Sequence, residues 1–108
     1  MSPAAHGRNG FGRINLGRPC EHVRIAPGKP AANLLTQRSH IGHELATRAR
    51  YGVPCGAVYR VVGGRVDVSI YSIGSFDVAT LSAERGGGGH RNAAGFTLPL
   101  DTWIRDYL

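Results

Sequence analysis

Hydrophobic and polar residues alternate most regularly in the middle of the chain, in two segments that flank a pair of glycines. Residues 57–62 read AVYRVV, residues 63–64 are both glycine, and residues 65–71 read RVDVSIY. A period of two with many β-branched residues is typical of a strand that buries one face. Glycine readily supplies the positive φ that a two-residue hairpin turn requires. The middle of the chain is therefore predicted to be a β-hairpin.

A longer periodicity precedes the hairpin. From Ile41 to Ala49 apolar residues recur every four positions, which places them on one face of a helix. Thr36 or Ser39 can cap the start of this helix, and Gly52 can end it. The segment before the hairpin is therefore predicted to be helical.

Three further elements are predicted after the hairpin. Residues 75–85, SFDVATLSAER, are typical of a short helix with Ser75 as its N-cap. Residues 96–98, FTL, predict a third strand. Residues 100–108, LDTWIRDYL, predict a terminal helix whose Trp-Ile pair at 103–104 covers the core.

These elements together predict an α/β fold in which helices flank a small mixed β-sheet. A chain of 108 residues with 42% hydrophobic content is sufficient for a single domain, which we place at residues 31–108. Residues 1–30 mix Gly, Arg, Asn and Pro with scattered apolar residues. That composition favours a flexible, poorly ordered basic arm, with a short extended piece at residues 23–25.

Charge and cysteine content narrow the functional classes. Thirteen Lys and Arg against seven Asp and Glu give a formal charge of +6, which favours a polyanionic partner such as nucleic acid, although other basic proteins share this property. Cys20 and Cys55 lack a C-x-x-C motif and a secretory context. We therefore expect two reduced thiols in a cytoplasmic protein, with a disulfide as the alternative. No apolar run approaches the ~20 residues that cross a bilayer, so no membrane association is expected.

A run of four glycines carries the strongest chemical signal. It lies within residues 84–96, ERGGGGHRNAAGF, between a predicted helix and a predicted strand. A flexible spacer usually joins domains, whereas this run lies inside one, which favours a shaped loop. Without Cβ atoms, successive backbone N–H groups can converge on an anion, and a helical turn over residues 90–94 would point its N-terminus at the same place. The predicted phosphate-binding residues are Gly86, Gly87, Gly88, Gly89, His90, Arg91 and Asn92.

The same residues resemble a known family. GGGGHRNAAGF is similar to the signature loop of the DHH-associated domain, the C-terminal substrate-binding domain of DHH-family phosphoesterases, which include RecJ-like exonucleases, oligoribonucleases and nucleotide phosphatases. The similarity extends back through VDVSIYS and IGHELATRA, so it covers roughly residues 33–98. It implies that the glycines and His90 contact the phosphate or the nucleotide end of the substrate.

Two departures from the family limit what the resemblance implies. Many members carry Ser-Leu-Arg-Ser where this chain has Ser69, Ile70, Tyr71 and Ser72, so a phosphate-binding arginine is missing. The two serines and the tyrosine are candidate base or phosphate contacts, and Tyr71 can stack on a base or simply pack. The family's Asp-His-His triplet and its pair of divalent metals, usually manganese, belong to a separate N-terminal domain, and this chain contains no such triplet.

No catalytic residue and no metal site are therefore predicted in this chain. His40, His43 and Glu44 have metal-like spacing but lack a third ligand at a fixed interval, and the matching family helix is scaffold. The leading hypothesis is a domain that binds a short oligonucleotide or nucleotide and works with a DHH catalytic domain, either joined to it or in trans. Whether the chain is part of an enzyme stays open. The alternatives are a stand-alone RNA- or DNA-binding module, as in domains appended to alanyl-tRNA synthetases, and a remnant that binds nothing.

Overall fold

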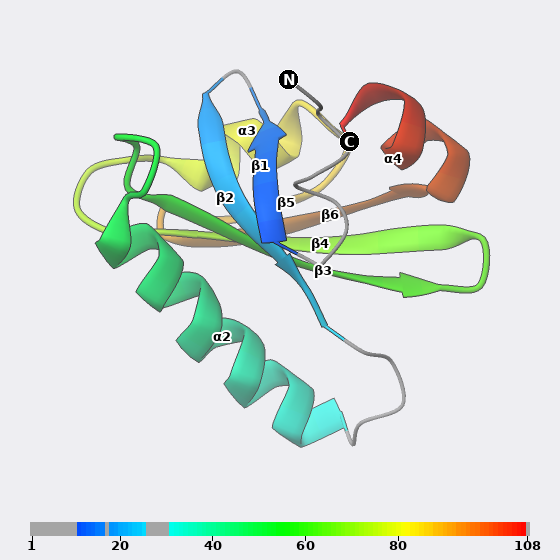
Figure 1. Cartoon of the computed structure of the whole chain (residues 1–108), viewed down its shortest axis with the longest axis horizontal. Coiled ribbons are helices and arrows are strands. Elements are labelled where there is room, and N and C mark those ends of the chain that lie inside the picture. Colours follow the sequence, from blue (N-terminus) through cyan, green and yellow to red (C-terminus); the bar gives the residue numbers. More distant parts are fainter. Residues whose placement is uncertain (1–10, 17, 26–30, 108) are drawn as a thin grey trace.

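The computed structural model describes residues 11–16, 18–25 and 31–107. Its centre is a six-stranded sheet with the strand order β1-β2-β3-β4-β6-β5 (Figure 1). The strands are β1 (Phe11–Asn15), β2 (Pro19–Arg24), β3 (Cys55–Val62), β4 (Arg65–Ser72), β5 (Gly88–His90) and β6 (Ala93–Pro99). The helices are α2 (Ala31–Arg48), α3 (Val78–Ala83) and α4 (Leu100–Asp106). Because β2 pairs parallel with β3 and every other pair is antiparallel, the predicted mixed α/β sheet is confirmed.

The predicted hairpin forms as expected. Strands β3 and β4 pair from Val62 and Arg65 at the turn back to Cys55 and Ser72, and Gly63 has a φ of 60°. The alternate aliphatic residues of β4 are fully buried, which fixes the register, since a slip of one residue would expose them all.

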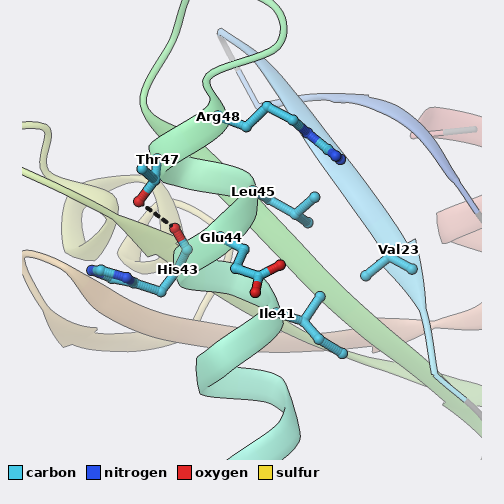
Figure 2. Close-up of a pocket in the computed structure, with 7 residues that line it drawn as sticks. All are labelled: Val23, Ile41, His43, Glu44, Leu45, Thr47 and Arg48. Atoms are coloured by element: carbon cyan, nitrogen blue, oxygen red, sulfur yellow. Dashed lines mark hydrogen bonds between the residues drawn. The ribbon is translucent and has the colours of Figure 1, made fainter.

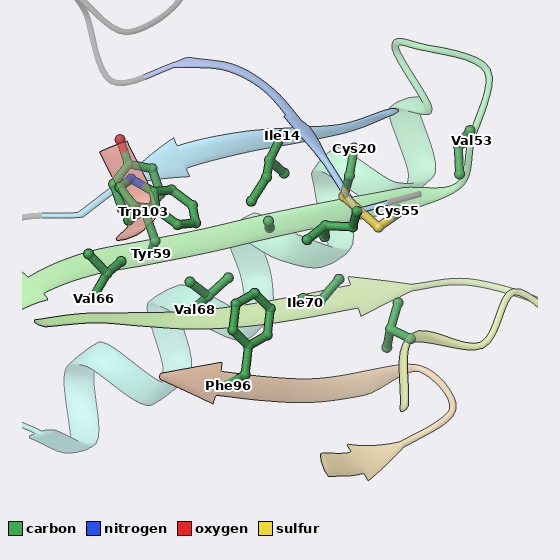
Figure 3. Packing of buried hydrophobic residues seen from close by; sticks show 13 residues of the cluster. Ile14, Cys20, Val53, Cys55, Tyr59, Val66, Val68, Ile70, Phe96 and Trp103 are labelled. Atoms are coloured by element: carbon green, nitrogen blue, oxygen red, sulfur yellow. A yellow bond between two sulfur atoms is a disulfide. The ribbon is translucent and has the colours of Figure 1, made fainter. Parts of the chain in front are cut away.

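The two faces of the sheet carry different helices. Helix α2 packs on one face, chiefly over β3 and β4, and α3 and α4 lie on the other (Figure 1). The main core fills the α3–α4 face, where Trp103 packs among side chains of β1, β3, β4 and β6 (Figure 3). A smaller cluster of Val23, Leu45 and Val58 fixes α2 to the opposite face. None of the described helices combines the length and hydropathy needed to cross a lipid bilayer.

The interpretation of residues 11–25 as part of a flexible arm is wrong for the residues that the structure describes there. They form β1 and β2, and the side chains of Ile14, Leu16 and Cys20 are completely or almost completely buried. The segment has too few apolar residues to fold by itself, but it buries them against a core supplied by the rest of the chain. The short extended piece predicted at residues 23–25 is confirmed for Val23 and Arg24, which are the last two residues of β2. Residues 1–10, 17 and 26–30 of the predicted arm lie outside the described part.

The expectation of two reduced thiols is also wrong. Cys20 on β2 and Cys55, the first residue of β3, form a disulfide with their Cα atoms 5.3 Å apart. The sequence could not reveal this pairing, because it depends on the parallel contact between two strands far apart in the chain. The expected cytoplasmic location rested on reduced cysteines, so it loses that support.

The helix boundaries differ in detail from those predicted. Helix α2 begins at Ala31, before the predicted caps, and the N-cap of α3 is Asp77 rather than Ser75. The Oδ1 atom of Asp77 accepts hydrogen bonds from the next turn, including one of 2.9 Å from the Ala79 N–H. In α4, Trp103 is buried as predicted, but Ile104 is 56% exposed and does not cover the core.

An ion-pair clamp attaches the end of α2 to β2. The buried carboxylate of Glu21 accepts two hydrogen bonds from Arg48, of 3.2 and 2.7 Å, and Arg50 Nη1 lies 3.6 Å from the same group. Removing one partner of a buried ion pair leaves the other charge uncompensated, so this clamp opposes separation of α2 from β2.

Tyr59 gives the protein a predictable alkaline instability. It packs against Trp103 with ring centroids 4.7 Å apart, and burial raises its pKa despite the opposing charge of Arg24. The folded state keeps the phenol proton to a higher pH than the unfolded state does, so stability falls as pH rises above about 10. We expect Tyr59→Phe to flatten the dependence of unfolding free energy on pH, measured by urea denaturation between about pH 9 and 11. Equal slopes in the two proteins would contradict this.

Candidate functional site

The glycine run forms an edge strand rather than a loop that leads into a helical turn. Gly88–His90 is strand β5, which pairs antiparallel with β6, and residues 91–92 make the tight turn between them. The predicted helical turn over residues 90–94 is therefore wrong. Residues 93–94 pair with both β4 and β5, and these ladders satisfy backbone groups that a helical turn would leave unpaired.

The glycines of the run have different structural roles. A side chain at Gly87 would collide with the backbone of Gly95, and at Gly89, where φ is 144°, a Cβ would lie 2.6 Å from Ala94 Cα. These two positions need glycine to let β5 lie against β6. At Gly88 a Cβ would meet nothing within 4 Å. Gly88 is thus the position of β5 where space is open.

The strand register gathers several predicted site residues on the α2 face of the sheet. One row runs through Tyr71, Ala93 and His90, and the next runs through Ser69, Gly95 and Gly88. Residues paired directly across a sheet point to the same face, and Tyr71 packs in the cluster below α2. Because α2 packs chiefly on β3 and β4, the part of this face on β6 and β5 is left exposed. We call this surface, made of Ser69, Gly88, His90, Ala93 and Gly95, the open shelf.

A depression of about 310 Å³ adjoins the open shelf at the end of β4. Helix α2 contributes Ser39 and His43 to its wall. The rest of the wall comes from the end of β4 and the turns beside it, with Tyr71, Ser72, Ile73, Gly74, Asn92 and Ala93. None of the residues of the shelf or the depression is acidic, and His43 and His90 can both donate hydrogen bonds.

Ser72 and Asn92 form hydrogen bonds with neighbouring groups of the protein that stabilise this surface. Asn92 Nδ2 donates to Ser72 Oγ at 2.9 Å and to the carbonyl of Gly74 at 3.1 Å. The Ser72 hydroxyl lies 2.6 Å from the Phe76 carbonyl oxygen and 3.1 Å from that of Arg91, to which it can donate. This network fixes the β5–β6 turn to the end of β4.

Tyr71 lies where α2 and the sheet approach most closely. A Cβ at Gly42 of α2 would overlap its ring, so glycine is what allows the ring to lie against the helix. The tyrosine is half-buried and still lines the depression. The ring of Tyr71 can therefore pack against α2 and also contact a ligand in the depression. Both roles considered for it, packing and stacking on a base, are compatible with this position.

The structure brings some predicted site residues together and leaves others apart. Gly88, His90, Ser69 and Tyr71 share one face, whereas the side chain of Arg91 is exposed in the turn beside it. Three α2 residues were not predicted as site residues: Arg38, whose Nη1 donates to Ser69 Oγ at 3.1 Å, and Ser39 and His43, which line the depression. The interval of four between Ser39 and His43 puts them on one helix face, but only the packed structure shows which part of the sheet that face meets.

The metal-like spacing in α2 has a different explanation. His40 pairs with Glu44 at 2.9 Å, one helical turn apart, and both side chains are exposed. Among the residues that the structure describes, no group of three or more His, Cys, Asp or Glu side chains is placed to hold a metal ion.

A larger groove of about 650 Å³ lies between α2 and β2 (Figure 2). Figure 2 shows Val23, Ile41 and Leu45 facing one another across it, while His43 points away to the other side of the helix. Its wall is mostly aliphatic, and Arg48 on its rim is already paired with Glu21. The open shelf and its depression therefore fit an anionic ligand better than this groove does.

No protein-family model matches the chain, and no curated protein does either. Solved structures similar to it include the following three. An uncharacterized protein from Helicobacter pylori G27 is 22% identical over 73% of this chain and 20% of its own, with a TM-score of 0.46. A pGpG-specific phosphodiesterase from Vibrio cholerae is 11% identical over 80% of this chain and 29% of its own, with a TM-score of 0.50. An exopolyphosphatase-related protein from Bacteroides fragilis is 20% identical over 71% and 23%, with a TM-score of 0.43.

The likeness to the Vibrio protein concerns the fold alone, because the identity is low. The chain spans less than a third of the length of each of these three proteins. Its α/β fold is thus shared with part of a phosphodiesterase.

Proposed function

We propose that this chain is the substrate-binding part of a phosphoesterase of the DHH type, and that the open shelf holds the phosphate end of a nucleotide or short oligonucleotide. The observation that carries the proposal is the register, which puts Gly88 and His90 on one exposed, non-acidic face. The resemblance of the glycine-histidine segment to the DHH-associated signature supports it, as does a fold shared with part of a phosphodiesterase.

Each residue of the shelf has a distinct proposed task. Gly88 leaves room for the phosphate to approach the backbone of β5. The imidazole of His90 donates a hydrogen bond to a phosphate oxygen, and Arg91 in the adjacent turn adds positive charge. Tyr71 at the edge of the depression contacts the base. Gly86, Gly87 and Gly89 shape the backbone, and Ser72 and Asn92 fix the turn.

Hydrolysis is assigned to a separate domain. A two-metal phosphoesterase needs several carboxylate and imidazole ligands around ions ~4 Å apart. The described part of this chain holds no such group. The proposal therefore places divalent metal, manganese in the resemblance, on a DHH domain that is joined to this chain or acts in trans. The task of this chain is to bind and orient the phosphoester.

Binding of labelled mono-, di- and pentanucleotides, followed by fluorescence anisotropy at low and moderate salt, tests the proposal. We expect wild type to prefer the short ligands, and His90→Ala and Gly88→Val each to weaken binding about tenfold or more, since a hydrogen bond to a charged group is worth about 1.5–3 kcal/mol. His40→Ala is the matched control, because His40 is an exposed histidine paired with Glu44. Thermal unfolding checks that all variants are folded.

The net charge of +6 favours a second candidate, a stand-alone RNA- or DNA-binding module. Such a module would bind longer strands better, with affinity that falls steeply as salt rises and with little effect of His90→Ala. Binding that survives both shelf variants and depends only on salt would replace the first proposal with this one.

A further inference from the structure

A further cavity lies between α4 and the ends of β2 and β3, on the face of the sheet opposite the open shelf. Its volume is about 250 Å³, and its wall is made of Arg24, Tyr59, Val61, Leu100, Trp103 and Ile104. We call it the α4 pocket. Because α2 and the open shelf share the other face, the α4 pocket is separate from the proposed phosphate site. What is inferred from it does not depend on the proposed function.

The strand register and the helix period bring the lining side chains together. Arg24 of β2 pairs with Tyr59 of β3, and residues paired directly across a sheet point to the same face. Val61 lies two residues further along β3, so its side chain is on that face too. The other two α4 residues of the wall follow Leu100 at intervals of three and four, which places all three on one side of the helix. The pocket therefore follows from the same regular elements that build the main core.

Two contacts fix the position of α4 beside the pocket. The backbone N–H of Leu100 donates to the carbonyl of Gly64 at 2.8 Å, which attaches the start of the helix to the hairpin turn. The ring of Trp103 packs on that of Tyr59 with centroids 4.7 Å apart (Figure 3). Trp103 is 1% exposed, whereas Ile104, the next residue, is 56% exposed. The wall of the pocket thus extends from buried aromatic rings to an exposed isoleucine.

The lining residues define the chemistry of a fitting ligand. All are apolar or aromatic except Arg24, which is exposed and is the only charged residue of the wall. Burial raises the pKa of Tyr59 and the charge of Arg24 opposes that rise, so the guanidinium acts electrostatically on this pocket. An apolar body in the pocket leaves water, which is favourable, and a guanidinium binds an anionic group through parallel N–H donors. The pocket therefore suits a ligand with an apolar body and a negative charge.

We propose that the α4 pocket binds a small organic carboxylate whose apolar body is about the size of one aromatic ring. The body packs against Tyr59, Trp103 and Ile104, and the carboxylate accepts hydrogen bonds from Arg24. The volume of about 250 Å³ is below the ~300–1,000 Å³ of pockets for larger ligands, which restricts the body to a single ring. A singly charged carboxylate matches the single cation of the wall, whereas a doubly charged phosphate monoester would keep one negative charge uncompensated.

Trp103 is the only tryptophan of the chain, so its fluorescence reports directly on the α4 pocket. Titration with phenylacetate, and with phenylacetamide as a neutral ligand of nearly the same shape, tests the inference. We expect wild type to bind phenylacetate about fivefold more tightly, because an exposed ion pair contributes up to about 1 kcal/mol. Arg24→Gln should abolish this preference and change phenylacetamide binding by less than about twofold. Arg65→Gln is the matched control, because Arg65 is an exposed arginine of β4 on the opposite face of the sheet.

A second variant tests the apolar part of the pocket. Ile104→Ser removes apolar surface at an exposed position, so it should weaken both ligands about threefold or more and leave thermal unfolding close to that of wild type. The absence of a saturable fluorescence change with either ligand in folded wild type would overturn the inference. Equal affinities of wild type for the two ligands would overturn it as well, and this comparison needs no variant. A preference for phenylacetate that persists in Arg24→Gln would refute the role of Arg24.

Discussion

Gly87→Ala is expected to destabilise the protein by about 3 kcal/mol and to release β5 from the sheet, because overpacking at a site that cannot adjust costs this much. The new methyl group would overlap the carbonyl oxygen of Gly95 and lie 2.8 Å from Phe96 Cβ. Both belong to β6, which is itself held by β4, so the strand cannot move aside. The collision can be relieved only by breaking the β5–β6 pairing.

Gly88→Ala is the matched comparison, one residue further along the chain, at the start of β5. Its methyl group meets nothing within 4 Å, and its φ is not in the left-handed region. We expect its unfolding free energy to stay within about 0.5 kcal/mol of wild type. Urea denaturation measures both variants, and amide hydrogen exchange at residues 88–90 reports the pairing of β5. Equal stability of the two variants would show that β5 does not lie against β6 as described.

The elements predicted well from the sequence are those whose signals are local. The hairpin of β3 and β4 was predicted from a period of two and a glycine pair, all within the fifteen residues 57–71, and it formed as predicted. Helix α2 was predicted from its own periodicity, and α4 from the local sequence of residues 100–108. Their boundaries moved by a few residues, since helix ends depend on the tertiary contacts around them.

The N-terminal strands were missed because their stability is not local. Residues 11–25 hold few apolar side chains, but Ile14, Leu16 and Cys20 enter a core built by β3, β4 and α4. The composition of a segment shows only whether its own apolar residues can offset the entropy lost on ordering it. It does not show the apolar surface that distant residues provide for those side chains. The parallel pairing of β2 with β3 has no signature at all in the adjacent sequence.

Only part of the candidate site was singled out from the sequence. The glycine run and His90 stood out, because four glycines in the interior of a domain need a reason. The strand pairing that aligns them with Ser69 and Tyr71 was not foreseen, and neither was the use of Gly88 as the open position. Arg38 and His43 reach the site only through the packing of α2 on the sheet, which a single sequence does not specify.

Reduction of the Cys20–Cys55 disulfide is expected to lower the unfolding free energy by about 3–4 kcal/mol. The bond joins residues 35 apart in sequence, and the chain-entropy model gives this magnitude for a loop of that length. The bond also holds the β1–β2 pair to β3, where only four residues of β2 are paired. The disulfide thus stabilises the attachment of β1 and β2, the two strands that the sequence analysis did not predict.

Urea denaturation with and without a phosphine reductant tests this, with the double variant Cys20→Ser/Cys55→Ser as the control. Wild type should fall to the stability of the double variant on reduction, and the double variant should not respond to the reductant. Two free thiols titrated in purified, unreduced protein would contradict the pairing and restore the expectation of reduced cysteines.

The reduced protein is nevertheless expected to stay folded. Domains of this size have unfolding free energies of about 5–15 kcal/mol, which exceeds the expected loss. The clamp of Glu21 with Arg48 and Arg50 remains after reduction and still ties β2 to α2. A chain that keeps its shelf when reduced, with nucleotide binding unchanged, would be able to work in an oxidising or a reducing compartment. The shelf lies on β4, β5 and β6, whereas the disulfide joins β2 to β3, so we expect binding to survive reduction while thermal stability falls.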